Sequence, residues 1–150
     1  MAITVNWQPL TLEKIVEQVG ADVNFLTGTA KLRLVTDAHT PAHDTHDFWD
    51  DASAAELANG NGYVTGGVTL AGKTITYDSA SDQIRLDFDD PSWTFTAAKT
   101  WRYGYLVIDT AGADSTDPLY ARLTWDSNQT VSTAYTLTID AAGLLYLDTT

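Results

Sequence analysis

The sequence predicts an all-β fold: an antiparallel β-sandwich or small barrel with an N-terminal arm and a short helix. Three observations support this fold class. From residue 67 onward, polar and apolar residues alternate with period two, the pattern of strands that bury one face. Turn-forming residues separate the alternating runs, and no helical pattern lies between them. The chain also contains 23 threonines, a β-branched residue that suits the solvent face of a sheet.

The alternating runs predict which side chains face the core. Residues 101–108 are apolar on both faces and predict a central strand. Four residues on different strands are expected to meet in one cluster: Trp93, Tyr103, Leu123 and Leu137. The other inward positions follow the same spacing: Ile84, Leu86, Phe88, Phe95, Leu119, Ala121, Trp125, Tyr135 and Ile139.

Residues 1–36 are predicted to form the N-terminal arm. An apolar, strand-like stretch opens it, and a predicted strand over 31–35 closes it. Between them, apolar residues recur at helical spacing, with Thr11 as a cap and Gly20 as an end signal. A short helix is therefore expected in this interval.

The remaining residues, 37–150, are predicted to form the β-sandwich domain. Its first part, residues 37–66, reads as a long polar connection with one helical turn around 52–58. Connections of this length usually carry function or lie against a partner.

Composition limits the function classes. The 150 residues carry a net charge of −12, which disfavours binding to nucleic acid or to anionic membranes. Cysteine is absent, so neither a disulfide scaffold nor a thiolate site is available. No apolar run approaches 18 residues, and no basic segment precedes an apolar one at the N-terminus. We therefore expect synthesis in the cytoplasm, without a signal peptide or a membrane span.

Residues 67–74 match the phosphate-binding pattern G-x-x-x-x-G-K-[ST], but their context contradicts a nucleotide site. A phosphate loop needs a buried strand before it and a helix after it. Turn residues precede the match, and residues 74–78 alternate as a strand does. We predict that Lys73 lies in a turn or at a strand start with its ammonium group in solvent. Residues 109–112 resemble the magnesium loop of small GTPases, yet no guanine-reading Asn-Lys-x-Asp follows them.

The histidines and aspartates are the candidates for metal and catalytic sites. The spacing of His39, His43 and His46 leaves zinc binding open. Pro41 breaks the helix that would align them, which favours a solvated polar loop. A Ser-His-Asp triad would need one of these histidines, and no Gly-x-Ser-x-Gly elbow is present.

The aspartates at 87, 89, 90 and 109 suggest paired carboxylates or a calcium site as alternatives. Their positions are more typical of the outward face of a strand and its turn. No enzyme activity and no cofactor are predicted.

The tryptophans fall into two groups. Trp93, Trp101 and Trp125 lie on the apolar sides of predicted strands, which favours core packing over carbohydrate stacking. Trp7 and Trp49 lie outside the regular β pattern and are candidates for contacts with another chain. The candidate interface residues are therefore Ile3, Val5, Trp7 and Trp49.

A longer series of motifs resembles a family of small virion structural proteins of tailed bacteriophages. The similarity covers roughly residues 40–147 and is most specific in the glycine-rich run. Its segments are Asp44-Thr45, Phe48-Trp49-Asp50-Asp51, the run from Gly60 to Thr74, Ser92-Trp93-Thr94, Tyr105-Leu106-Val107-Ile108-Asp109 and Pro118-Leu119.

The resemblance implies a capsid-associated or neck-associated protein with no known chemistry. We expect a capsid decoration or cement protein at the virion surface, made in the host cytoplasm. Its partners would be the major capsid protein, copies of itself, or both. The N-terminal segment and residues 37–66 are expected to make most of these contacts.

Three alternatives remain open. A tail, neck or fibre component would share the β-rich composition. A carbohydrate-binding module would bind glycans through Trp7 or Trp49, and an NTPase would contact nucleotide at Lys73.

Overall fold

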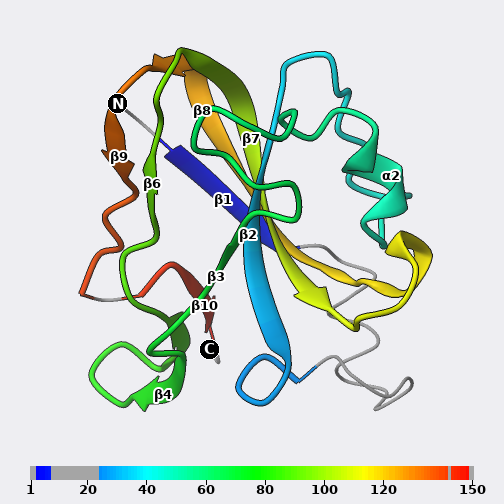
Figure 1. Ribbon diagram of the computed structural model, residues 1–150. Helices are drawn as coiled ribbons and strands as arrows, with labels where there is room; N and C mark the ends of the chain where they lie inside the picture. Colours follow the sequence, from blue (N-terminus) through cyan, green and yellow to red (C-terminus); the bar gives the residue numbers. More distant parts are fainter. Residues whose placement is uncertain (1–2, 8–23, 142, 149–150) are drawn as a thin grey trace.

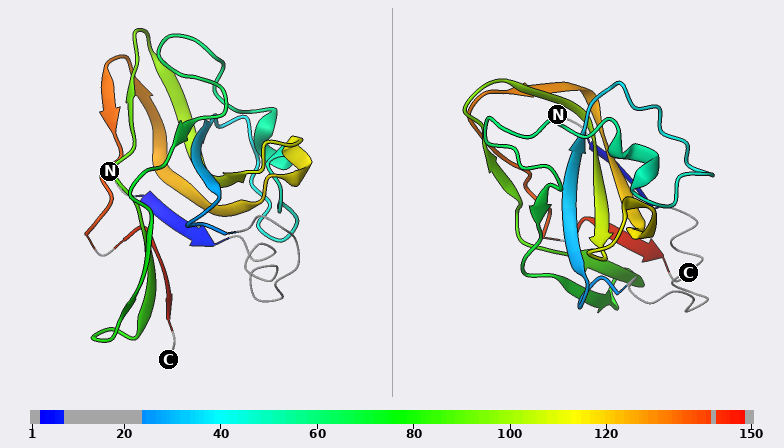
Figure 2. Two further views of the ribbon diagram at one scale, coloured as in Figure 1. Left: turned by 60° about the horizontal axis from the view of Figure 1, so that its bottom comes forward. Right: turned by 45° about the vertical axis from the view of Figure 1, so that its right-hand side comes forward.

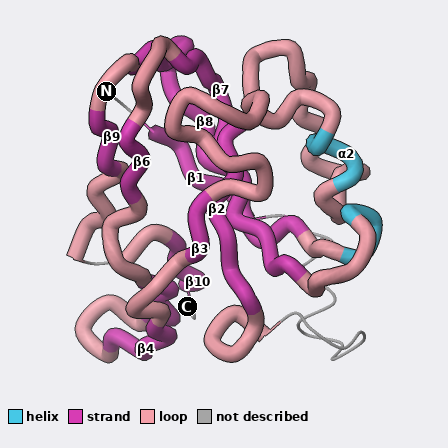
Figure 3. Tube along the Cα trace, in the orientation of Figure 1, coloured by secondary structure: helices cyan, strands magenta, loops and turns pink. Residues whose placement is uncertain are grey.

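The computed structural model describes residues 3–7, 24–141 and 143–148, and it confirms the all-β expectation (Figure 1). The helix expected after Thr11 lies outside the described residues. Figure 3 shows strands and loops with very little helix. The described elements are β1 (Ile3–Trp7), β2 (Thr29–Val35), α2 (Asp50–Ser53), β3 (Val68–Thr69), β4 (Thr74–Asp78), β5 (Gln83–Asp87), β6 (Ser92–Thr94), β7 (Lys99–Asp109), the 3-10 turn η1 (Asp114–Thr116), β8 (Leu119–Val131), β9 (Ala134–Thr136) and β10 (Leu145–Asp148).

The main sheet has five strands in the order β1-β8-β7-β2-β3, and all of its pairings are antiparallel. β7 lies at its centre, as the two-sided apolar pattern predicted. β1 pairs with β8, and β2 pairs with both β7 and β3. The strands of residues 1–36 are thus integral to the main sheet. The expected division into an arm and a separate β-domain is corrected on this point.

Two smaller sheets complete the fold. β6 pairs with β9, and β5 lies between β10 and β4. The turn between β4 and β5 falls at residues 79–82, one of the places where turn-forming residues separate two alternating runs. Figure 2 shows the β4–β5 hairpin, with β10 beside it, extending away from the main sheet. We call this hairpin the β4–β5 ribbon.

One face of the main sheet covers a large apolar cluster, here called the inner cluster. Trp93, Leu123 and Leu137 belong to it, as predicted. Trp101 and Trp125 also lie there with T-shaped rings, which confirms core packing for these tryptophans. Tyr103 is a correction, because it packs against a second cluster on the other face of the sheet.

The second cluster, here called the outer cluster, lies beneath residues 37–66. This covering segment was expected to be a polar connection that adapts to a partner. Instead it packs on the sheet and contributes buried side chains, so that expectation is wrong. Backbone hydrogen bonds from Leu57 to Leu34 and from Trp49 to Asp117 fasten it at both sides. The buried members of the outer cluster are Val35, Trp49, Ala52, Tyr105, Val107 and Leu119.

A β-bulge explains why Leu119 is on this face. The register of β7 with β8 shifts between Leu106, opposite Ala121, and Val107, opposite Leu119. Tyr120 is therefore the extra residue, and it packs in the inner cluster beside Ala121. Strict alternation placed Leu119 with Ala121, and the inserted residue reverses that assignment.

Candidate functional site

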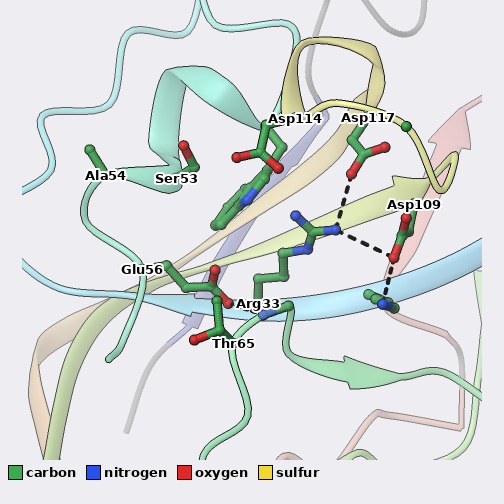
Figure 4. A pocket seen from close by; sticks show the side chains of 12 residues that line it. Arg33, Ser53, Ala54, Glu56, Thr65, Asp109, Asp114 and Asp117 are labelled. Carbon is green, nitrogen blue, oxygen red and sulfur yellow. Dashed lines mark hydrogen bonds and ion pairs between the residues drawn. The ribbon is translucent and has the colours of Figure 1, made fainter. Parts of the chain in front are cut away.

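A polar pocket of about 400 Å³ lies between the covering segment and the main sheet (Figure 4). β2 and the end of β7 form one wall, while α2 and the loop around η1 form the rim. Six of its residues are ionisable, which gives the pocket two basic and four acidic groups: Lys31, Arg33, Glu56, Asp109, Asp114 and Asp117.

Arg33 is the central charged group of this pocket. It occurs in the alternating run of β2, so its side chain points to the face opposite Leu32 and Leu34. Only 4% of the residue is exposed. Its Nη2 donates to Asp117 Oδ2 at 3.1 Å, and its guanidinium carbon lies 4.8 Å from the centre of the Trp49 ring. A buried charge needs such partners, because an unpaired one is strongly destabilising.

Asp117 completes this buried ion pair and also closes the loop around η1. It is 3% exposed. Its Oδ1 accepts hydrogen bonds from the backbone N–H and the hydroxyl of Thr110, at 2.8 and 2.9 Å. One carboxylate therefore joins β2 to the loop that follows β7.

Asp109 is the second carboxylate near the guanidinium. Its Oδ2 lies 2.5 Å from Lys31 Nζ and 3.7 Å from Arg33 Nη2. The hydrogen bond from Lys31 is the main cause that holds the pKa of Asp109 below its usual range. The GTPase-like run that begins here turns at Ala111, which has a φ of 58°. Asp109 is thus engaged by the basic residues of β2.

Glu56 occupies the opposite wall of the pocket, as Figure 4 shows. It accepts a hydrogen bond from Tyr63 Oη and another from the backbone N–H of Gly66, both at 2.7 Å. Burial raises the pKa of Glu56, and the two hydrogen bonds oppose that rise. Tyr63 Oη also accepts from the backbone N–H of Leu34 at 3.1 Å. Glu56 therefore fastens the glycine-rich turn to β2.

This arrangement favours binding over catalysis. The pKa of Glu56 is raised and that of Asp109 is lowered, as in an acid–base pair. Both carboxylates are nevertheless held by hydrogen bonds from the chain itself. Ser53 is the serine that lines the pocket, and its hydroxyl donates to the backbone carbonyl of Asp50. The pocket offers donors and acceptors to a polar group.

The histidine run was expected to be a solvated loop, and His39 corrects this expectation. His39 is 7% exposed, and its Nε2 lies 2.8 Å from Tyr105 Oη. Burial, reinforced by the nearby His46, lowers the pKa of His39 to about 4. His43 is exposed. Within the described residues, no group of three or more acidic or histidine side chains is placed to hold a metal ion.

The phosphate-loop match has the strand context that the sequence predicted. Residues 74–78 form β4, where a phosphate site would need a helix. Gly67 has a φ of 73°, and a side chain there would collide with the backbone of Leu32. Gly72 has a φ of 61°, and a side chain there would collide with the Asp89 carboxylate. These glycines allow close packing within the fold.

Lys73 differs from its expected position in solvent. Its Nζ donates to the backbone carbonyl of Gly28 and lies 5.8 Å from the centre of the Phe25 ring. The ammonium group therefore docks on the loop before β2 and is not free at the surface.

The candidate interface residues are only partly where they were expected. Ile3 and Val5 are half-buried against the inner cluster, as members of β1. Trp49 is 1% exposed, which corrects its expected role as a contact with another chain. The side chain of Trp7 lies outside the described part of the chain.

The remaining acidic candidates have local roles. Asp87 accepts from the backbone N–H of Phe88, and Asp90 accepts from that of Ile139. Asp89 lies beside Gly72, and Asp109 belongs to the pocket on the main sheet. The structure does not bring these four carboxylates together as one site.

Comparison with known protein families, curated proteins and solved structures finds no match to this chain. None of the helices in the described ranges has the length and apolar character needed to span a membrane. Of the six ionisable residues of the pocket, only Asp109 was a candidate site residue from the sequence. A signal was present, because the basic residues Lys31 and Arg33 alternate with apolar residues in the predicted strand over 31–35.

Proposed function

We propose that the protein is a bacteriophage virion structural protein that decorates or cements the capsid shell, and that it is not an enzyme. The motifs from residue 44 to residue 119 that resemble the phage family support the virion assignment. A decoration protein adds contacts across neighbouring capsid subunits and so favours the assembled shell by mass action.

The observation that carries this proposal is a contrast between two surfaces. In the pocket, the buried ionic groups Arg33 and Asp117 are paired with each other. On the β4–β5 ribbon, by contrast, Ile75 is 43% exposed and Tyr77 is 60% exposed. Large apolar side chains at the surface favour contact with another chain as the main role.

The acidic charge supports the same role. A net charge of −12 gives particles that carry many copies a strongly negative exterior. Like charge keeps such particles apart and soluble.

Mass spectrometry of purified particles of the phage that encodes the chain tests this proposal. We expect the protein in a fixed ratio to the major capsid protein, and electron microscopy should place it on the shell. Density at the neck, tail or fibres would replace decoration with that alternative. Absence from purified particles would overturn the virion assignment.

A second candidate function, carbohydrate binding, is favoured by the pocket alone. Hydroxyl groups can donate to carboxylates and accept from basic groups, so a neutral sugar matches the mixed lining of Lys31, Glu56 and Asp114. Trp49 cannot serve as an exposed stacking platform, because Arg33 lies over its ring and the residue is buried.

Titration with a panel of neutral hexoses and their disaccharides, followed by NMR, tests this second candidate. Saturable shifts in the pocket that Asp114→Asn weakens, while the control Asp44→Asn does not, would establish sugar binding. Asp114 and Asp44 are both exposed, and only Asp114 lines the pocket. No shift with any sugar of the panel would rule out this function for those ligands.

A further inference from the structure

β4 is an edge strand with one regular pairing. All five of its residues pair with β5, from Thr74 opposite Asp87 to Asp78 opposite Gln83, with no register shift. Among the described strands, none pairs with the other edge of β4. Proteins usually protect such an edge with proline, lysine, a bulge or an inward charge. The sequence of β4, TITYD, has none of these between Thr74 and Tyr77.

The side chains of β4 are exposed from Thr74 to Tyr77. Because strand residues alternate, Ile75 and Tyr77 lie on one face, together with their β5 partners Leu86 and Ile84. Leu86 is buried in the inner cluster, and Ile84 is half-buried. The apolar face of the ribbon thus begins at the core and continues outward into exposed residues.

The outer strand β4 carries one charged side chain, Asp78, although the ribbon as a whole, residues 74–87, has three aspartates and one arginine and a net charge of −2. The Asp78 carboxylate lies 2.5 Å from Arg85 Nη2, so its charge is compensated within the ribbon. Tyr77 Oη donates to Asp82 Oδ1 at 2.6 Å. The one charged side chain of β4 is therefore paired with a basic group, which limits electrostatic repulsion between two copies along this edge.

We propose that two copies of the chain associate through β4, in an antiparallel pair with its two-fold axis at Thr76. In this register, Ile75 of each copy lies opposite Tyr77 of the other, and Thr74 lies opposite Asp78. No like charges face each other, and the two apolar faces form one surface. The three-stranded sheets of the two copies then join into one six-stranded sheet.

The alternating pattern selects this register. A shift by one residue would place the apolar face of one copy beside the threonine face of the other. A two-fold axis at Tyr77 would leave Ile75 opposite Ser79, outside the strand. Only the axis at Thr76 pairs all five residues of β4 and matches both apolar side chains.

The contact is small, which determines its strength. Five paired residues with a few exposed apolar side chains bury less than the roughly 1,200 Å² of a standard stable interface. The dimer is therefore a reversible one that forms with rising concentration. On a surface that holds many copies, a high effective concentration would favour it.

Sedimentation velocity over a concentration series tests the pairing, with Thr76→Lys and the matched control Thr136→Lys. Thr76 and Thr136 are both exposed strand residues, and only Thr76 lies on the proposed axis. We expect the wild type and the control to dimerise alike, and Thr76→Lys to weaken dimerisation at least tenfold, because it sets two ammonium groups opposite each other. A wild type that stays monomeric at all concentrations, or equal dimerisation of Thr76→Lys, would overturn the proposal.

A crosslink gives a second readout that does not depend on affinity alone. The chain has no cysteine, so a disulfide in Thr76→Cys can form only between two copies. Opposed residues of antiparallel strands have Cα atoms about 4.5–5.5 Å apart, within the range that a disulfide spans. We expect Thr76→Cys to crosslink at least tenfold faster than Thr136→Cys under mild oxidation. Equal rates would contradict the two-fold axis at Thr76, whatever the fate of the virion assignment, because the assay uses only the isolated protein.

Discussion

β7 and β4 are both antiparallel strands with apolar side chains, yet they differ in what surrounds them. β7 pairs with β8 and β2, and residues from Gly104 to Ile108 are buried. Among the strands of the described ranges, β4 pairs with β5 alone, and its residues from Thr74 to Tyr77 are exposed. Apolar residues on β7 therefore contribute to the stability of the fold. Those on β4 contribute little to it and are available for contact.

The strongest test of this difference is truncation of one aromatic residue in each strand. Trp101 is fully buried, with its ring 4.9 Å from that of Tyr135. We expect Trp101→Ala to lower the free energy of unfolding by about 3–5 kcal/mol, because it leaves a large cavity. Tyr77→Ala is the matched change in β4 and should stay within about 0.5 kcal/mol. Urea unfolding measures both, and equal losses would contradict the division between the strands.

The buried ion pair gives the next largest effect. Asp117→Ala should cost about 3 kcal/mol, because it leaves the Arg33 guanidinium buried without its main partner. The exposed Asp114 on the same rim is the control, and Asp114→Ala should cost less than about 0.5 kcal/mol. A double variant, Arg33→Met with Asp117→Leu, should recover much of the loss. Thermal or urea unfolding of the four proteins tests this, and a small loss in Asp117→Ala would show that the pair is dispensable.

His39 makes the stability of the covering segment depend on pH. Its pKa is lowered to about 4 in the folded state, from 6.5 in an unfolded chain. Between these values the unfolded chain binds the extra proton, so the free energy of unfolding decreases as pH falls from 6.5 toward 4. The raised pKa of Glu56 acts in the opposite direction at the acid end of this window.

Comparison of the wild type with His39→Gln separates the effect of His39 on the free energy of unfolding from that of Glu56. We expect the variant to lose less stability than the wild type when urea unfolding is measured between pH 6.5 and 4.5. Parallel pH profiles for the two proteins would show that His39 is not the titrating group.

Lys73 gives a smaller effect on stability. Its hydrogen bond to the Gly28 carbonyl and its position over Phe25 predict that Lys73→Ala costs about 0.5–1.5 kcal/mol. Calorimetric titration of ATP or GTP with magnesium should show no saturable binding to the wild type. Binding that depends on Lys73 would contradict the strand interpretation of the phosphate-loop match.

The sequence predicted the strands well where alternation was strong. β5 and β7 follow directly from periodicity, because β5 alternates between an apolar and a polar face and β7 is apolar on both faces of the main sheet. Periodicity failed at Leu119, where a bulge adds one residue, and in the covering segment. The covering segment buries Trp49, Leu57 and Tyr63 without any regular period, so its polar composition concealed its role.

The candidate site was harder to predict than the fold. Arg33, Glu56 and Asp117 are separated by many residues in the chain. Arg33 belongs to β2, Glu56 to the covering segment and Asp117 to the loop after η1, so the packing of three separate segments brings them together. Local spacing instead drew attention to the histidines and to the phosphate-loop match. The basic residues Lys31 and Arg33 in the alternating run of β2 were a local sign of the ion pairs in the pocket.

Hydrogen–deuterium exchange at low and high protein concentration tests the division between β7 and β4 most directly. Amides of β7 should exchange slowly under both conditions, because the strand is paired on both sides and buried. Amides on the outer edge of β4 should exchange quickly in dilute solution and slow down as copies associate. Rapid exchange of β4 at every concentration, or slow exchange of its outer edge in dilute solution, would contradict this account.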